Sequence, residues 1–215
     1  MSLAITARLA LFFGSLEQAE QISCLTATAQ AALVCDARVQ RGLSLQARHE
    51  ARHAQVFGAA ATALSFGTRT ASPLGGALQA YAFALQRDLR ARNLAGSLIG
   101  LQGMLEGLGM VALSPPCTPL ARAASCVVPL RAAMLKQEEL HHAHGMKVLA
   151  SALRSDARCA RAAVEALDRY GALSAAIVEA GMELFDHYAH DQTVFRRACD
   201  DARRHVQRAV HAATC

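Results

Sequence analysis

The 215-residue chain contains no Trp, and only 5% of its residues are aromatic. It has 5 Pro and 14 Gly, which are too few for a β sandwich with many turns. Runs of β-branched residues are scarce and Ala is abundant, which favours helices over strands. Since 53% of the residues are hydrophobic, the chain is predicted to fold as one all-α domain, residues 1–215.

The 7 Cys show no C-x-x-C spacing, which fits reduced thiols in a cytoplasmic protein. Arg8 interrupts the apolar N-terminal stretch, so no signal peptide is predicted. The formal charge of +5 comes mainly from scattered Arg residues, and no aromatic residues interleave with them. A solvated basic surface is therefore expected, and nucleic acid is not a predicted partner.

Apolar residues recur at helical spacing along nearly the whole chain. Residues 1–152 are predicted to form the core bundle, with accessory helices over 153–215 and a hinge near Gly171. Within 93–121 the only ionisable side chain is Glu106, so a membrane span and a closely packed internal helix both remain open. The expected helices cover 4–33, 37–66, 77–92, 94–113 and 120–152, followed by two or three between 156 and 213.

Three Glu-x-x-His motifs stand out, since residues 1–136 contain only four Glu and two His. One joins Glu50 to His53, and two overlapping motifs join Glu138 to His141 and Glu139 to His142. Residues three positions apart lie on one helix face, so both side chains of a motif can reach one metal ion.

The spacing of two further glutamates selects among these motifs. Glu17 precedes Glu50 by 33 residues, and Glu106 precedes Glu139 by the same interval. Each interval fits two antiparallel helices joined by a short turn. In such a pair, two residues at equal distances from the turn lie opposite each other. The predicted metal-binding and catalytic residues are Glu17, Glu50, His53, Glu106, Glu139 and His142.

Four buried carboxylates require compensating charge, which two divalent cations supply. Mixed oxygen and nitrogen ligands suit two Fe ions, with an Mn/Fe pair as the alternative. One Glu from each of two helices, and Glu-x-x-His from each of two others, is the ligand pattern of di-iron helical bundles.

On these residues the chain resembles the ferritin-like di-iron carboxylate superfamily. The resemblance implies a ferritin-like four-helix bundle with additional C-terminal helices. It also implies that Glu138, and less clearly His49, orient ligands from outside the metal shell. The stretch SLIGLQGMLEGLGMVALS further resembles the apolar helix of the aldehyde-deformylating oxygenases.

The resemblance implies a non-haem di-iron oxygenase or oxidase that uses O2 to oxidise an apolar small molecule, such as a fatty aldehyde. An external electron donor, a reductase or a ferredoxin, is then required. A ferroxidase and a scaffold with a degenerate site are the alternatives, and a homodimer or contact with a membrane surface stays open. A C-terminal polar cluster is expected to be an exposed helix face, with a lid or a third metal position as the alternative; its members are Glu183, Asp186, His187 and His190.

Overall fold

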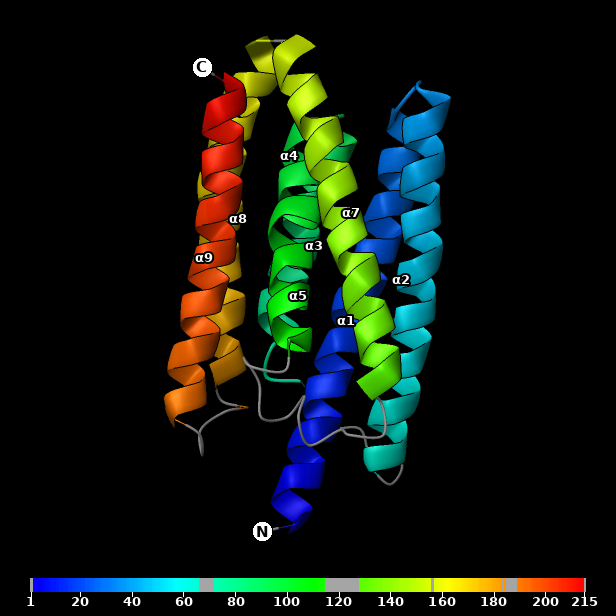
Figure 1. Cartoon of the computed structure of the whole chain (residues 1–215), viewed down its shortest axis with the longest axis vertical. Coiled ribbons are helices and arrows are strands. Elements are labelled where there is room, and N and C mark those ends of the chain that lie inside the picture. Colours follow the sequence, from blue (N-terminus) through cyan, green and yellow to red (C-terminus); the bar gives the residue numbers. More distant parts are fainter. Residues whose placement is uncertain are drawn as a thin grey trace.

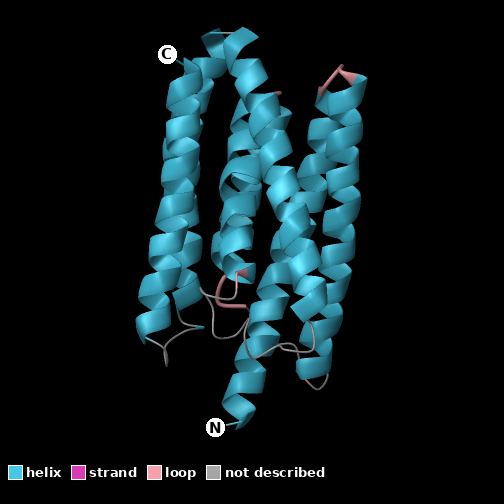
Figure 2. Ribbon diagram, in the orientation of Figure 1, coloured by secondary structure: helices cyan, strands magenta, loops and turns pink. Residues whose placement is uncertain are grey.

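Every element that the computed structural model describes is helical, which confirms the predicted all-α fold (Figure 2). The structure describes residues 2–65, 72–114, 128–155, 157–182, 184 and 189–214. The elements are α1 (Ser2–Leu33), α2 (Ala37–Leu64), α3 (Gly75–Arg90), α4 (Leu94–Leu98), the π-helical segment η1 (Ile99–Leu105), α5 (Glu106–Leu113), α7 (Val128–Ser155), α8 (Ala157–Met182) and α9 (Ala189–Thr214).

Local signals in the sequence explain several of these boundaries. The side chain of Asp36 accepts hydrogen bonds from the backbone N–H groups of Arg38 and Val39 at 2.7 and 3.0 Å, so it caps the start of α2. Pro129 is the second residue of α7, where a missing N–H costs no helical hydrogen bond. The predicted hinge at Gly171 is wrong, because α8 continues through this buried glycine.

Two helical pairs form the four-helix bundle. Helix α1 packs along α2, and the continuous helix of α4, η1 and α5 packs against α7. Contacts of α2 with α7 and of α1 with η1 join the two pairs. Helices α8 and α9 lie on the other side of the central α4–η1–α5 helix, and α3 fills the space between α1 and α8 (Figure 1).

The buried stripes of the bundle helices carry polar residues at positions where a simple bundle would carry apolar ones. Along α1 and α7, buried residues alternate at spacings of three and four, as in closely packed helix pairs. The stripe of α1 contains Phe13, Leu16, Glu20, Ser23, Ala27 and Gln30. The stripe of α7 contains Met134, Glu138, His141, Gly145 and Leu149.

Among the described residues, the Leu94–Leu113 helix alone is long and apolar enough to cross a membrane. In the structure, 78% of its apolar window is buried by the surrounding helices, which favours the closely packed internal helix among the two alternatives left open by the sequence. Its middle is π-helical: the Glu106 N–H donates to the carbonyl oxygen of Leu101, five residues back. Such π-helical insertions occur frequently at functional sites.

A buried carboxylate connects α3 to α8 away from the bundle centre. Asp88 is only 4% exposed and accepts hydrogen bonds from Arg169 Nη2 at 2.5 Å and from the Tyr170 hydroxyl at 2.7 Å. Asn93 Nδ2 donates to its other oxygen at 3.2 Å. Three donors thus satisfy one charge, and they tie α3 and the following turn to α8.

Replacing Asp88 by alanine is expected to destabilise the fold by about 3 kcal/mol, because it leaves the guanidinium of Arg169 without its partner in a largely buried place. For a chain of this length, that corresponds to a fall in Tm of about 6–12 °C. Thermal unfolding followed by circular dichroism measures it. Asp201 is the control, because it pairs with Arg204 at 2.6 Å on the surface; a loss of equal size in Asp201→Ala would contradict the role given to Asp88.

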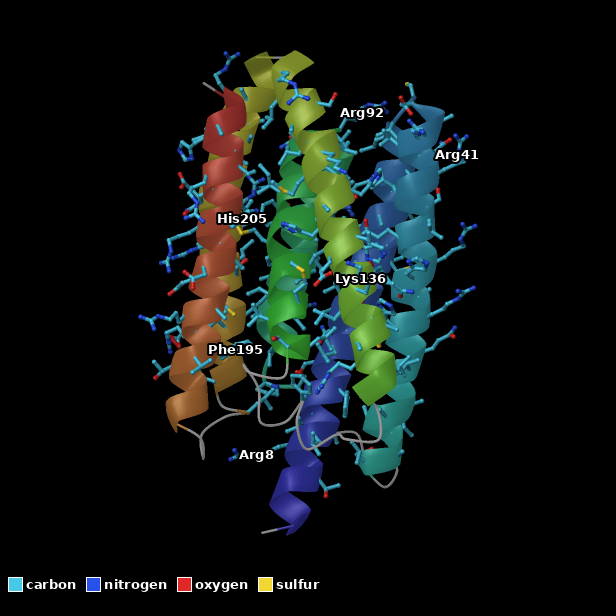
Figure 3. All side chains as sticks on the ribbon, in the orientation of Figure 1. Arg8, Arg41, Arg92, Lys136, Phe195 and His205 are labelled. Atoms are coloured by element: carbon cyan, nitrogen blue, oxygen red, sulfur yellow. The ribbon has the colours of Figure 1, made fainter. Side chains whose placement is uncertain are left out.

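The charged side chains lie mainly on the outside of the helices (Figure 3). Arg41 and Arg92 are exposed and point away from the bundle, as a solvated basic surface requires. The described cysteines, Cys24, Cys35, Cys159 and Cys199, form no disulfide, as the irregular spacing predicted.

Candidate metal centre

Four carboxylates and two imidazoles meet in the centre of the four-helix bundle. Glu20 comes from α1, Glu50 and His53 from α2, Glu106 from the first turn of α5, and Glu138 and His141 from α7. All six residues are at most 8% exposed. We call these six residues the centre.

The centre consists of two overlapping groups of possible ligands, and each group's ligand atoms lie within 4.8 Å of one another. The first group comprises Glu20, Glu50, His53 and Glu138. Nδ1 of His53 lies 3.0 Å from Glu138 Oε1, 3.1 Å from Glu50 Oε2 and 3.6 Å from Glu20 Oε2. One atom of every member therefore faces a common point.

The second group repeats this plan around His141 and comprises Glu50, Glu106, Glu138 and His141. Nδ1 of His141 lies 2.8 Å from Glu50 Oε1 and 3.9 Å from oxygens of Glu106 and Glu138. Glu50 and Glu138 belong to both groups, and each presents its two oxygens to different histidines. Each group thus draws three members from one helical pair and one member from the other.

Five polar atoms of the centre lack the hydrogen bonds that buried groups normally have. Glu50 Oε1 and Oε2, Glu138 Oε1, and Nδ1 of both His53 and His141 are buried and make no hydrogen bond. Buried polar atoms in native proteins are rarely left unpaired. Converging carboxylate oxygens and imidazole nitrogens are the donor set that Fe(II) and Mn(II) accept, so the residues present fit two divalent metal ions.

Without metal, the electrostatics of the centre favour bound protons. Burial raises the pKa of both Glu20 and Glu106 well above the ordinary value, and nearby carboxylates raise it further. Burial opposes protonation of His53, but Glu138, Glu20 and Glu50 outweigh it and raise its pKa to about 12. The site therefore attracts positive charge, which divalent cations supply more fully than protons.

The residue before each Glu-x-x-His motif supports the histidine of the other motif. Gln137 Oε1 accepts a hydrogen bond from Nε2 of His53 at 2.7 Å, and Nδ1 of His49 lies 3.0 Å from Nε2 of His141. Each bond leaves Nδ1 of the inner histidine free to bind a metal ion. The structure thus places His49 outside the centre, as expected, but it places Gln137 rather than Glu138 in the corresponding position.

The structure corrects the predicted place of Glu139 and His142. Glu139 is half exposed and pairs with Lys136 at 3.1 Å, on the outside of α7. His142 donates from Nδ1 to the carbonyl oxygen of Gln102 at 2.6 Å, so this nitrogen already carries a hydrogen. The overlapping motif of Glu138 and His141 faces the centre instead, because the buried stripe of α7 passes through these positions.

Glu17 also lies outside the centre, and Glu20 takes the place predicted for Glu17. Glu17 accepts from Gln21 Nε2 at 3.3 Å and lies over Gly58 of α2, where an added Cβ would meet its carboxylate. The centre is one helical turn farther along α1. Two of the helices therefore contribute different residues from those that equal spacing selected.

The close approach of α7 to η1 depends on Gly145. A Cβ at this position would overlap the Cβ and Cγ of Gln102, a fully buried residue. Gly145→Ala is therefore expected to destabilise the fold by about 1–3 kcal/mol through overpacking, measured by urea unfolding. Gly109→Ala is the control: nothing lies within 4 Å of an added Cβ there, and the helical alanine should stabilise by about 0.5 kcal/mol. Equal stability of both variants would contradict the packing constraint.

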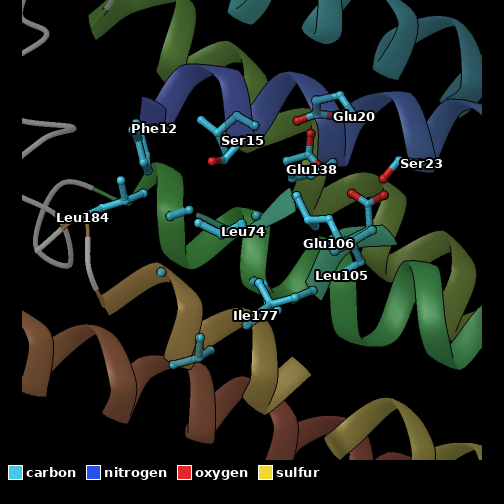
Figure 4. Close-up of a pocket in the computed structure, with 18 of the residues that line it drawn as sticks. Phe12, Ser15, Glu20, Ser23, Leu74, Leu105, Glu106, Glu138, Ile177 and Leu184 are labelled. Atoms are coloured by element: carbon cyan, nitrogen blue, oxygen red, sulfur yellow. The ribbon is translucent and has the colours of Figure 1, made fainter. Parts of the chain in front are cut away.

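An apolar pocket opens beside the centre, with an empty volume of about 760 Å³ that includes its open part. Figure 4 shows the carboxylates of Glu20, Glu106 and Glu138 at one end, with Phe12 and Leu184 toward the other. Residues of α1, α3, α8 and α9 also line the pocket. The helices outside the bundle thus form part of an apolar wall that leads to the centre.

The predicted C-terminal polar cluster lies largely outside the described residues. Glu183, Asp186 and His187 are not described, and of His190 only the backbone, in α9, is described. The alternatives given for this cluster stay predictions.

Comparison with known proteins identifies the fold. No protein-family model matches the sequence, and no curated protein matches it. Among solved structures, the chain is similar to a point mutant of an R2-like ligand-binding oxidase with aerobically reconstituted Mn/Fe cofactor. The identity is 15%, the match covers 100% of this chain and 81% of the other, and the TM-score is 0.66. The predicted ferritin-like fold is confirmed, and the narrower resemblance to aldehyde-deformylating oxygenases stays a prediction.

Proposed function

We propose that this chain is an oxidase or oxygenase that binds two metal ions, either Fe/Fe or Mn/Fe, and uses O2 to oxidise a small apolar molecule. The observation that carries the proposal is the pair of overlapping ligand groups, five of whose buried atoms make no hydrogen bond. The similar solved structure, an oxidase with an Mn/Fe cofactor, supports the same metal chemistry.

The pocket beside the centre supports an apolar substrate. Its wall consists mostly of Phe, Leu, Ile, Val and Ala side chains, and polar groups gather at the end where the centre lies. A ligand in this pocket would be held largely by burial of apolar surface, with one end next to Glu20, Glu106 and Glu138. We expect chain-like or cyclic apolar molecules with one oxidisable position, of which a fatty aldehyde is one example.

Bound metal ions would supply O2 binding and electron transfer, and the protein residues would supply the surroundings. The shared carboxylates of Glu50 and Glu138 would hold the two ions together, while His53 and His141 would each bind one. The apolar pocket wall would exclude water from the reacting atoms. Insertion of one oxygen atom into a substrate consumes O2, two electrons and two protons and releases water, so we propose an external electron donor in the cytoplasm.

The experiment loads the full chain anaerobically with two Fe(II) per chain and then adds O2, with and without a panel of apolar alcohols, aldehydes and acids. We expect O2 uptake that is coupled to oxidation of one substrate class, measured with an oxygen electrode and mass spectrometry. Oxidation of many Fe(II) per chain with mineral formation would instead indicate an iron-storing ferroxidase. Failure to retain metal would contradict the proposal as a whole.

A further inference from the structure

Three buried glutamines form a hydrogen-bonded row that ends at the centre. Gln30 of α1, Gln46 of α2 and Gln102 of η1 are 0, 1 and 0% exposed. Gln30 and Gln102 exchange hydrogen bonds of 3.1 and 2.7 Å, and Gln102 Nε2 also donates to Gln46 Oε1 at 3.0 Å. Gln46 Nε2 then donates to Glu106 Oε1 at 2.9 Å.

The hydrogen bonds of the row fix which way each amide points. The oxygen of Gln46 accepts from Gln102, so its NH2 group must face Glu106. A reversed Gln46 would place its NH2 against the NH2 of Gln102 and, with Glu106 ionised as a metal ligand must be, its oxygen against the carboxylate of Glu106. Both contacts would be repulsive, and in a buried place they would be costly.

The row ends at a backbone carbonyl group in the first turn of α4. Gln30 Nε2 donates to Ser97 Oγ at 3.3 Å, and the Ser97 hydroxyl donates to the carbonyl oxygen of Leu94. Ser97 is itself fully buried. The row therefore connects one carboxylate of the centre to fixed groups of α1, α2 and α4.

Glu106 has two oxygens in different surroundings as a result. Oε1 accepts from Gln46, whereas Oε2 faces the centre, 3.9 Å from Nδ1 of His141. We infer that Gln46, held by Gln102 and Gln30, is a positioning residue that makes Glu106 bind metal through Oε2 alone. This inference rests on the proposed two-metal function, since it concerns how one ligand binds.

The test uses Co(II), whose visible absorption weakens as its coordination number rises. Gln46→Met keeps the length of the side chain but removes the donor, so Oε1 of Glu106 becomes free to bind as a second oxygen. We expect two Co(II) per chain in both proteins, a weaker visible band for one of the two ions in the variant, and affinity for that ion lower by roughly 10- to 100-fold. The control is Gln79→Met on the exposed face of α3, which should keep the wild-type spectrum.

A Gln46→Met variant with the wild-type Co(II) spectrum would overturn the inference, even if its affinity were lower, because the amide would then matter only for packing. Gln102→Met is the second variant, should Gln46→Met not fold. It leaves Gln46 and Glu106 in place but removes the donor that fixes Gln46, and the same change in the spectrum is expected. Wild-type protein that binds fewer than two Co(II) would contradict the proposed function itself, before any variant is compared.

Discussion

Glu138→Ala is expected to leave less than one metal ion per chain, whereas Glu139→Ala at the next position should retain both. Glu138 belongs to both ligand groups and faces both histidines, so its loss removes a ligand from each ion. Glu139 pairs with Lys136 at the surface and faces neither group. Metal analysis after anaerobic loading with Fe(II) and desalting measures the difference.

A second pair of neighbours sharpens this test. Glu20 belongs to one group only, so Glu20→Ala should lose one ion of the two, and Glu17→Ala should lose neither. Circular dichroism of every variant separates loss of a ligand from loss of the fold. Retention of both ions by Glu138→Ala together with their loss from Glu139→Ala would restore the ligand set that equal spacing predicted.

Removal of the metal ions is expected to lower the stability of the protein strongly at neutral pH. An ion present at 100 times its Kd stabilises the folded state by about 2.7 kcal/mol, and two ions give about 5 kcal/mol. For a chain of this length, that corresponds to a difference in Tm of about 10–20 °C between loaded and chelated protein. Differential scanning calorimetry with and without a chelator measures it.

The difference in Tm between loaded and chelated protein should grow as the pH rises. The pKa values of Glu20 and Glu106 are raised in the folded, metal-free protein, because burial favours the protonated form. Protonation of these groups therefore stabilises the fold below the unfolded value of about 4.5, and this contribution is lost as the pH rises. The pKa of His53 is raised from 6.5 to about 12, so protonated His53 also stabilises the folded, metal-free protein. This stabilisation likewise decreases as the pH rises above 6.5.

Metal binding has the opposite dependence, since deprotonated ligands bind cations more tightly. The loaded protein should therefore keep its Tm from pH 5 to 8 while the chelated protein loses stability over this range. A constant difference in Tm, or one that shrinks with rising pH, would be incompatible with metal binding at these buried carboxylates.

The sequence alone predicted the helices and the general chemistry of the centre, because both follow from local periodicity. Glu50 and His53, joined by their motif, and Glu106, isolated in an apolar stretch, lie in the buried group, and their binding of metal stays a prediction. Helix ends were also close to the observed ones, where Asp36, Ser114 and their neighbours interrupt the apolar pattern.

Which residues of the neighbouring helices face these three depends on the axial register between the helices, and the periodicity of one helix does not specify this register. Glu20 and Glu50 each lie 15 residues from Cys35, at the middle of the turn between α1 and α2. The rule of equal distance from the turn therefore holds for this pair of helices. It selects Glu20 instead of Glu17 once Asp36 is taken as the cap of α2, because the turn is then centred on Cys35. In the second pair, the segment between α5 and α7 is too long for such a rule, and only the buried stripe of α7 selects Glu138 and His141.

The supporting residues could not be predicted, because they depend on contacts between distant elements. The row of Gln30, Gln46 and Gln102 joins three segments, and no local pattern distinguishes these glutamines from exposed ones. The π-helical turn before Glu106 likewise arises in the packed structure, where Gln102 lies against Gly145 and its carbonyl oxygen accepts from His142.

Each half of the bundle contributes one carboxylate to the ligand group of the other half, so neither half holds a complete group by itself. The α1–α2 pair needs Glu138 to finish its group, and the pair formed by the 94–113 helix and α7 needs Glu50. Neither half can assemble a full set of ligands before the halves dock. Cations bound at the centre would consequently be held by both halves at once and would strengthen the contact between them.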